Sequence, residues 1–344
     1  MKKDFLRKGA FAIAALLLTS SVANAQQIPN KRELIYQVLD QSRPNDYVPA
    51  AFFLHFKDKL GLKAVQEHVE FFKATNMDIV KIQYEIVVPH IDINKPEDWK
   101  KVPVYDKEFF APQIEVIEAI SGQLQGQALV FPTVYSPLAL LSQTVGKKDI
   151  VELIKKDPEA VKPALENISK SIINYLDAAR EHGADGFYVS SQGGDLKTFG
   201  GTKAWDIIRP YDKSISEHAH KIAPINILHV CDYGSSYKDQ ATLEGYADYP
   251  TSIINPPVNL EKGSVDLKHL QKAFNRPVFG GLDRLGVLVT GSIEDAKKEV
   301  DRILENAPDN FILGADCTVP SETDYARLRE IIDYAHNWRK SHKK

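Results

Sequence analysis

Two short apolar runs, Ile225-Asn226-Ile227-Leu228-His229-Val230 and Asn310-Phe311-Ile312-Leu313-Gly314, each precede one of the two cysteines of the chain. Both runs are typical of strands that are buried on both faces. His229 and Cys231 are two positions apart, so in a strand their side chains point to the same face. Cys317 lies 86 positions after Cys231. It reaches the same point only if the fold brings the ends of two distant strands together.

Six further apolar runs share this strand-like character, and stretches with helical spacing of apolar residues separate most of them. They cover residues 50–56, 78–85, 128–133, 186–191, 249–255 and 277–282. Eight short strands that mostly alternate with helices predict a single (β/α)8 TIM barrel. A doubly wound sheet is the alternative, although no glycine-rich phosphate-binding motif follows any of the strands.

The first 25 residues have the features of a secretory signal peptide. Basic residues at positions 2, 3, 7 and 8 precede an apolar segment over 10–18, and Ala23-Asn24-Ala25 fits a cleavage site. We therefore predict cleavage after Ala25, a periplasmic location, and one barrel domain over residues 26–344. Lys2-Lys3 resembles the start of a twin-arginine signal, so the choice between the Sec and Tat routes stays open.

Charge and hydropathy narrow the classes of partner. The whole chain has a formal net charge of −3, and removal of the leader's four basic residues and one acidic residue leaves −6. A mildly acidic protein without basic clusters is unsuited to nucleic acids. No second long apolar run follows the leader, so we predict no membrane span in the mature chain.

His229, Cys231 and Cys317 have two chemical interpretations. One histidine and two cysteines suit tetrahedral zinc with a fourth position left open. Two cysteines in an exported protein also suit a Cys231–Cys317 disulfide, because disulfides persist outside the cytoplasm. The histidine two residues before Cys231 favours zinc, since a disulfide makes no use of it.

Other polar residues follow the predicted strands, where barrel enzymes place their active sites. Among them, His55 and Glu85 lie at the carboxyl ends of the first two strands, and Asp283 follows the seventh. We interpret these three as candidate catalytic residues. Each has an alternative as an ordinary residue of a strand end or loop.

The chain resembles the uroporphyrinogen decarboxylase superfamily from about residue 47 to 338. Within it, the closest resemblance is to zinc-dependent methyltransferases that move a methyl group from a corrinoid protein to a thiol such as coenzyme M. The residues that carry this resemblance are the His229-x-Cys231 pair and the block from Gly314 through Cys317 to Pro320.

The resemblance implies a zinc ion held by His229, Cys231 and Cys317, which binds a substrate thiol as thiolate for methyl transfer or demethylation. It implies a small thiol or methylated compound as substrate and a corrinoid protein as a candidate methyl donor. A carboxylate would complete the coordination in the absence of a thiol, with Glu85 as the first candidate and Asp195 as the second.

Two other functions remain as alternatives. A uroporphyrinogen decarboxylase-type lyase is disfavoured, because those enzymes grip the carboxylates of their substrate with an arginine-rich segment at the start of the barrel. Here residues 50–55 are mostly apolar, and no arginine lies between Arg43 and Arg180. The second alternative is an exported binding protein without enzymatic activity, stabilised by the Cys231–Cys317 disulfide.

Overall fold

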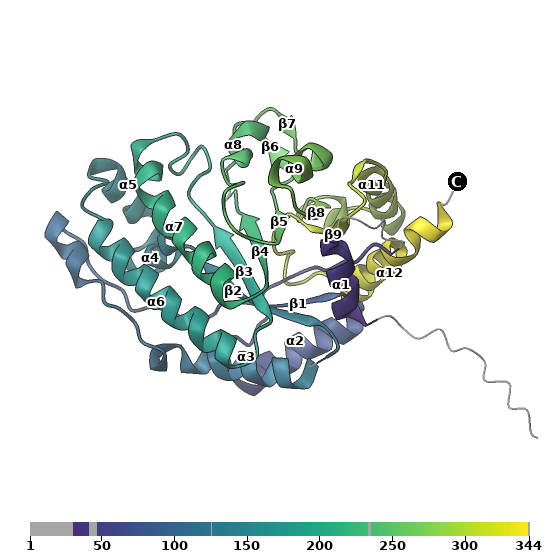
Figure 1. The fold of residues 1–344 in the computed structure, drawn as a ribbon, viewed down its shortest axis with the longest axis horizontal. Helices are drawn as coiled ribbons and strands as arrows, with labels where there is room; N and C mark the ends of the chain where they lie inside the picture. Colours follow the sequence, from purple (N-terminus) through teal and green to yellow (C-terminus); the bar gives the residue numbers. More distant parts are fainter. Residues whose placement is uncertain (1–29, 41–46, 125, 233–234, 343–344) are drawn as a thin grey trace, which may run out of the picture.

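The computed structural model describes residues 30–342 apart from 41–46, 125 and 233–234. The predicted signal peptide therefore lies outside the described residues. Within them, a curled parallel sheet occupies the centre of the molecule and helices cover its outer face (Figure 1). No described helix combines the length and apolar character needed to cross a membrane.

Seven parallel strands form the sheet, in the order β1-β2-β3-β4-β5-β8-β9. They are β1 (Ile79–Ile82), β2 (Leu129–Tyr135), β3 (Gly186–Ser191), β4 (Ile225–Val230), β5 (Ile253–Asn255), β8 (Val278–Leu282) and β9 (Phe311–Ala315). Spatial order follows sequence order throughout, whereas a doubly wound sheet reverses direction at a switch point. The structure therefore rules out the doubly wound alternative.

Helices connect the strands and pack on one another around the outside of the sheet. They are α1 (Lys31–Leu39), α2 (Gly61–Thr75), α3 (Ala111–Leu124), α4 (Pro137–Val145), α5 (Lys147–Lys156), α6 (Lys162–Glu181), α7 (Lys203–Ile222), α8 (Gln240–Glu244), α9 (Leu267–Phe274), α10 (Val287–Thr290), α11 (Ile293–Asn306) and α12 (Tyr325–Ser341). The last of them, α12, packs against α2, so the helical layer brings an early and a late helix of the described chain together.

Some connections contain short elements that periodicity did not predict. Two 3-10 turns, Pro96–Lys101 and Glu108–Phe110, lie in the irregular excursion between β1 and α3. An antiparallel hairpin of β6 (Asn259–Leu260) and β7 (Gly263–Ser264) lies between β5 and α9.

The predicted first strand, residues 50–56, is not a strand in the structure. A single bridge joins Ala50 to Leu313 in β9, and the Asp78 N–H donates to the Ala50 carbonyl. Beyond this point the carbonyls take other partners: that of Phe53 accepts from the Val319 N–H, and that of Leu54 accepts from the side chain of Gln83. The segment thus lies between β9 and β1, but its ladder-like backbone hydrogen bonds are confined to the residues around Ala50.

Helix α1 and the buried carboxylate of Asp78 fasten the start of the sheet. Lys31 donates to the carbonyls of Asn76 and Met77 and forms an ion pair of 3.2 Å with Asp78. Asp78 also accepts from the Tyr47 hydroxyl at 3.0 Å, the Ala50 N–H at 2.8 Å and the His336 imidazole at 2.8 Å. We call Asp78 and these four partners the Asp78 latch. The latch ties both ends of the described chain to the residue before β1.

Candidate metal centre

Strand β4 and the segment after β9 bring the three predicted ligands together. One ligand atom from each of His229, Cys231 and Cys317 lies within 4.8 Å of the other two. His229 is the fifth residue of β4, Cys231 follows that strand directly, and Cys317 is two residues beyond β9. Because the strands are parallel, their carboxyl ends share one edge of the sheet. Cys231 and Cys317 therefore lie close together although they are 86 positions apart in the sequence. We call these three residues the His-Cys-Cys cluster.

The chemistry of the His-Cys-Cys cluster fits a soft divalent metal. Neither cysteine is part of a disulfide in the structure. Both ring nitrogens of His229 are buried and have no hydrogen-bond partner among the described residues. A buried imidazole without partners is unfavourable, and a metal bound at one nitrogen would remove part of that penalty. The residues present therefore fit a group that could hold a metal ion.

The cluster also favours a thiolate at Cys317. A hydrogen bond from Cys231 is the largest influence and lowers the pKa of Cys317 well below that of an ordinary thiol. Burial opposes this shift, whereas His229 and Lys81 reinforce it. Thiolates are the form of cysteine that binds metals and acts as a nucleophile.

Stacking, not hydrogen bonding, orients the His229 ring. The Tyr188 ring from β3 lies 5.2 Å from it, at an interplanar angle of 25°. The Tyr188 hydroxyl donates to Asn255 Oδ1 at 2.6 Å. The Asn255 amide in turn donates to the carbonyls of Phe279 in β8 and Ala315 in β9. Asn255 thus connects the platform beneath His229 to the strand that precedes Cys317.

The structure pairs His55 with Glu85 but does not bring either into the cluster. The His55 imidazole lies 3.0 Å from Glu85 Oε1, and the Lys59 ammonium lies 3.2 Å from the same oxygen. Burial raises the pKa of Glu85, but these two partners outweigh it and the net shift is downward. No carboxylate of the described residues joins the three ligand atoms within 4.8 Å of one another. Glu85 is therefore engaged in ion pairs at the rim.

The two other predicted carboxylates have local structural partners. Asp283 accepts from the Leu285 N–H at 2.8 Å and from the Asn259 amide at 3.4 Å, which shapes the turn after β8. Asp195 is fully buried, and its Oδ1 accepts from the N–H and hydroxyl of Thr198 at 3.1 Å. Neither belongs to the His-Cys-Cys cluster.

Sequence reasoning missed Arg284, which bridges the acids beside the two cysteines. Its Nη1 lies 3.6 Å from Asp316 Oδ2 and 3.9 Å from Asp232 Oδ1. Its backbone N–H also donates to Asp316 Oδ1 at 3.0 Å. Burial raises the pKa of Asp316 to about 6, although these contacts with Arg284 oppose the shift. The adjacent residue Asp283 was the only signal in this loop that the sequence offered.

Another buried carboxylate, Asp212 in α7, lies behind the ends of β3 and β4. It accepts hydrogen bonds from the hydroxyls of Ser191, the last residue of β3, and Tyr249. Burial raises the pKa of Asp212 to about 7, although both hydroxyls act in the opposite direction.

This shift predicts a pH dependence of stability that Asp212→Asn removes. In the unfolded chain the carboxyl ionises near pH 4, so between about pH 4 and 7 unfolding releases a proton. Wild-type stability should fall by about 2 kcal/mol from pH 5 to pH 7 through this group alone. Urea unfolding at both pH values measures it. Asp206→Asn, an exposed change on the same helix, should leave the wild-type slope intact. Equal slopes for wild type and Asp212→Asn would contradict the prediction.

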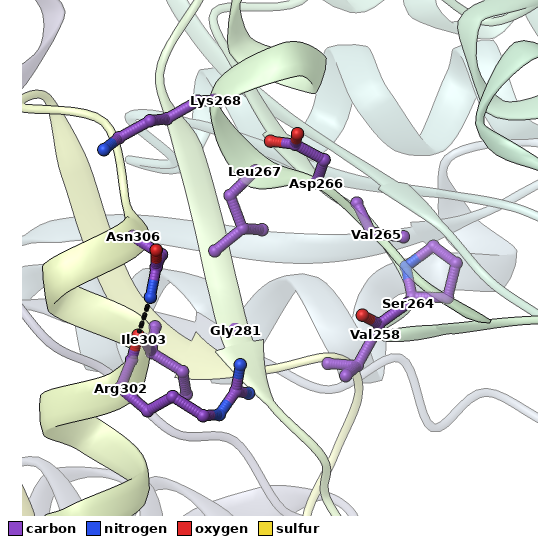
Figure 2. A pocket seen from close by; sticks show the side chains of 11 residues that line it. Val258, Ser264, Val265, Asp266, Leu267, Lys268, Gly281, Arg302, Ile303 and Asn306 are labelled. Atoms are coloured by element: carbon purple, nitrogen blue, oxygen red, sulfur yellow. Dashed lines mark hydrogen bonds between the residues drawn. The ribbon is translucent and has the colours of Figure 1, made fainter.

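A separate cavity of about 270 Å³ lies outside the sheet, between α9 and α11 (Figure 2). Its lining includes Leu267 and Lys268 at the start of α9, Ile303 and Asn306 of α11, and Gly281 of β8. It contains none of the residues of the His-Cys-Cys cluster. The cavity is therefore separate from the candidate metal centre.

Comparisons with known proteins agree with the fold. The chain matches the uroporphyrinogen decarboxylase (URO-D) family over residues 72–338. A methyltransferase from Methanosarcina mazei superposes with a TM-score of 0.71 at 16% identity, covering 90% of this chain and 98% of that one. A putative vitamin-B12 independent methionine synthase from Listeria monocytogenes gives 0.52 at 11% identity, over 85% and 98%. No curated protein matches the chain.

The two structural matches are too distant in sequence to show more than a shared fold. The family match spans most of the chain, including the helices and strands that carry His229, Cys231 and Cys317. It agrees with the predicted resemblance to the superfamily. The chain belongs to the uroporphyrinogen decarboxylase family.

Proposed function

We propose that this protein is a zinc-dependent, methyltransferase-like enzyme that activates a small thiol. The observation that carries the proposal is the His-Cys-Cys cluster, whose ligand atoms lie within 4.8 Å of one another. It includes a buried histidine whose ring nitrogens have no hydrogen-bond partner among the described residues. Two thiolates and one imidazole are the ligand types that zinc prefers, and three protein ligands leave a fourth position for a substrate.

The residues of the chain have distinct roles in this proposal. His229, Cys231 and Cys317 would hold the metal, and Tyr188 orients the imidazole. Zinc, when bound, would lower the pKa of a thiol ligand so that it stays ionised at neutral pH. Burial beside the sheet interior limits access of water to Cys231 and His229, which are 8% and 3% exposed.

In the proposed transfer, the thiolate sulfur of the substrate forms a bond to a methyl carbon. The bond between that carbon and its donor breaks, and the electron pair remains with the donor. A methylated corrinoid on a partner protein is the donor class that the resemblance implies. The thiol proton leaves to solvent before the transfer.

The segment that precedes β1 also bears on the alternatives. We infer that residues 49–53 take the eighth position of a TIM barrel, with the hydrogen bonds of Pro49–Ala51 to Leu313 in support. A decarboxylase of this family would need arginines near that segment, and none is present between Arg43 and Arg180. Thiol chemistry at the cluster therefore suits these residues better than decarboxylation.

Metal analysis of the purified protein tests the proposal. We expect about one zinc per chain in the wild type and its loss, by at least tenfold, in Cys317→Ser and in His229→Ala, because two ligands hold zinc far more weakly than three. His90→Ala, which removes an exposed imidazole paired with Asp92, is the matched control and should keep the metal.

Two results would contradict the proposal. One is a wild-type protein without zinc after incubation with the metal under reducing conditions. The other is zinc content that stays unchanged in both ligand variants. Thiols that react only after addition of a reductant would instead support the Cys231–Cys317 disulfide.

A further inference from the structure

The only lysine within the strands of the central sheet, among the described residues, is Lys81 of β1. Its strand neighbours are apolar, and the residue is 7% exposed. The ammonium donates one hydrogen bond, to Gln83 Oε1 at 2.8 Å. Within the part of the chain that the structure describes, no carboxylate lies within ion-pair distance of it. A buried charge without a paired carboxylate is unfavourable, so it needs another source of negative charge.

Aromatic rings hold this ammonium beside the metal centre. Lys81 Nζ lies 4.6 Å from the centroid of the Tyr188 ring and 5.2 Å from that of Phe53. The same Tyr188 ring stacks on the imidazole of His229. Lys81 and His229 therefore share one aromatic neighbour, and the charge is fixed in place by cation–π contact.

The electrostatics of Lys81 are directed at the two cysteines. Burial lowers its pKa to about 8, and the negative charges of Cys317, Glu85 and Cys231 act in the opposite direction. Of these, Glu85 already has two cationic partners in His55 and Lys59. Arg284 also acts on both sulfurs, but its guanidinium already pairs with Asp316 and Asp232. Lys81 therefore differs from Arg284 in acting on the two sulfurs without a described carboxylate in ion-pair contact.

Counting formal charges shows what Lys81 adds. A divalent metal with two thiolates and a neutral imidazole is neutral in total. A thiolate as fourth ligand makes it −1, whereas water, a neutral thiol or an imidazole leaves it at 0. The ammonium at +1 therefore balances the site only when the fourth ligand is an anion.

We propose that Lys81 is a positioning residue that makes the His-Cys-Cys cluster select an anionic fourth ligand, the thiolate form of the substrate, over neutral ligands. This inference rests on the proposed function. It assigns a role to the buried ammonium of Lys81, which the three ligands alone do not explain.

Cobalt(II)-loaded protein tests the inference, because ligand exchange at cobalt changes its visible absorption. The wild type and Lys81→Met are titrated with two probes, 2-mercaptoethanol and imidazole, between pH 6 and 9. Methionine has a similar length and removes a buried charge, so the variant should fold, and thermal unfolding verifies this. Lys107→Met, which removes the same charge from an exposed pair with Glu181, is the matched control.

We expect Lys81→Met to bind cobalt as the wild type does but to bind 2-mercaptoethanol at least tenfold more weakly at pH 7. The pH midpoint for thiolate binding should rise by about one unit or more. Imidazole affinity should stay within twofold, because that ligand is neutral. Lys107→Met should match the wild type with both probes.

The possible outcomes distinguish failure of this inference from failure of the proposed function. Equal weakening of thiol and imidazole would show a purely structural role and overturn the inference, as would unchanged affinity for both. A wild-type protein that takes up no cobalt would overturn the proposed function, and the inference would fall with it.

Discussion

Replacing Asp78 with alanine is expected to lower the free energy of unfolding by about 3–5 kcal/mol, the range for breaking a buried ion pair. The carboxylate is fully buried and accepts from Lys31, Tyr47, the Ala50 N–H and His336. Alanine removes the buried acceptor of the Ala50 N–H and the His336 imidazole and the counter-charge of Lys31, which is more costly than the loss of an exposed contact.

Urea unfolding at pH 7 measures this change. Asp92→Ala, which removes an exposed carboxylate paired with His90, is the control and should lie within about 0.5 kcal/mol of the wild type. A loss below about 1 kcal/mol in Asp78→Ala would contradict the importance of the Asp78 latch.

The Asp78 latch also predicts how the stabilisation by the Asp78 carboxylate changes with pH. Burial raises the pKa of Asp78, but the hydrogen bond and charge of His336, with help from Lys31, lower it below the ordinary value. A depressed carboxyl pKa stabilises the fold at pH values above about 4 and ceases to do so as pH falls through the folded value. The difference between wild type and Asp78→Ala should therefore shrink as pH falls below 4. A stability difference that does not change with pH would show that Asp78 stabilises the fold through packing and not through its charge.

Gly186→Ala is expected to destabilise the protein by about 4 kcal/mol, because no side-chain movement can relieve its clash. A Cβ at this position would lie 1.7 Å from the carbonyl oxygen of Ile225 and 2.9 Å from the Phe131 ring. Gly186 and Ile225 are partners across β3 and β4. The two strands would have to separate where β4 begins, and His229 lies on β4, so metal binding should weaken as well.

Thermal or urea unfolding measures the stability change, and metal content reports the effect on the site. The matched control is Gly122→Ala in α3, where an added Cβ meets nothing within 4 Å. Because alanine is the better helix former, this variant should gain up to about 1 kcal/mol. If Gly186→Ala stayed within 1 kcal/mol of the wild type, the close approach of β3 and β4 would not limit this position.

Much of the fold could be predicted from apolar runs, since seven of the eight predicted strands match β1, β2, β3, β4, β5, β8 and β9. The exception, residues 50–56, is as apolar as the others. It differs because Gln83 and Val319 bind the carbonyls of Leu54 and Phe53. A contact between a side chain and a distant carbonyl leaves no trace in local periodicity.

The convergence of His229, Cys231 and Cys317 could be predicted because their signal is chemical and scarce. The partners of Glu85 and Asp283 could not, because these are common residue types and the loops supply their partners. Lys81 did leave a signal, a charged residue between Val80 and Ile82 in a run otherwise typical of a buried strand.

Pro49–Ala51 pair with Leu313, and His336 of α12 binds Asp78, so the earliest and latest parts of the described chain complete one another. During synthesis from the N-terminus, the latch lacks one of its partners until residue 336 has left the ribosome. Cys317 likewise reaches His229 and Cys231 only after β9 has joined the sheet. A metal ion at the proposed site would therefore enter late in the maturation of this protein, after synthesis of nearly the whole chain, because no earlier folding intermediate contains all three residues of the cluster.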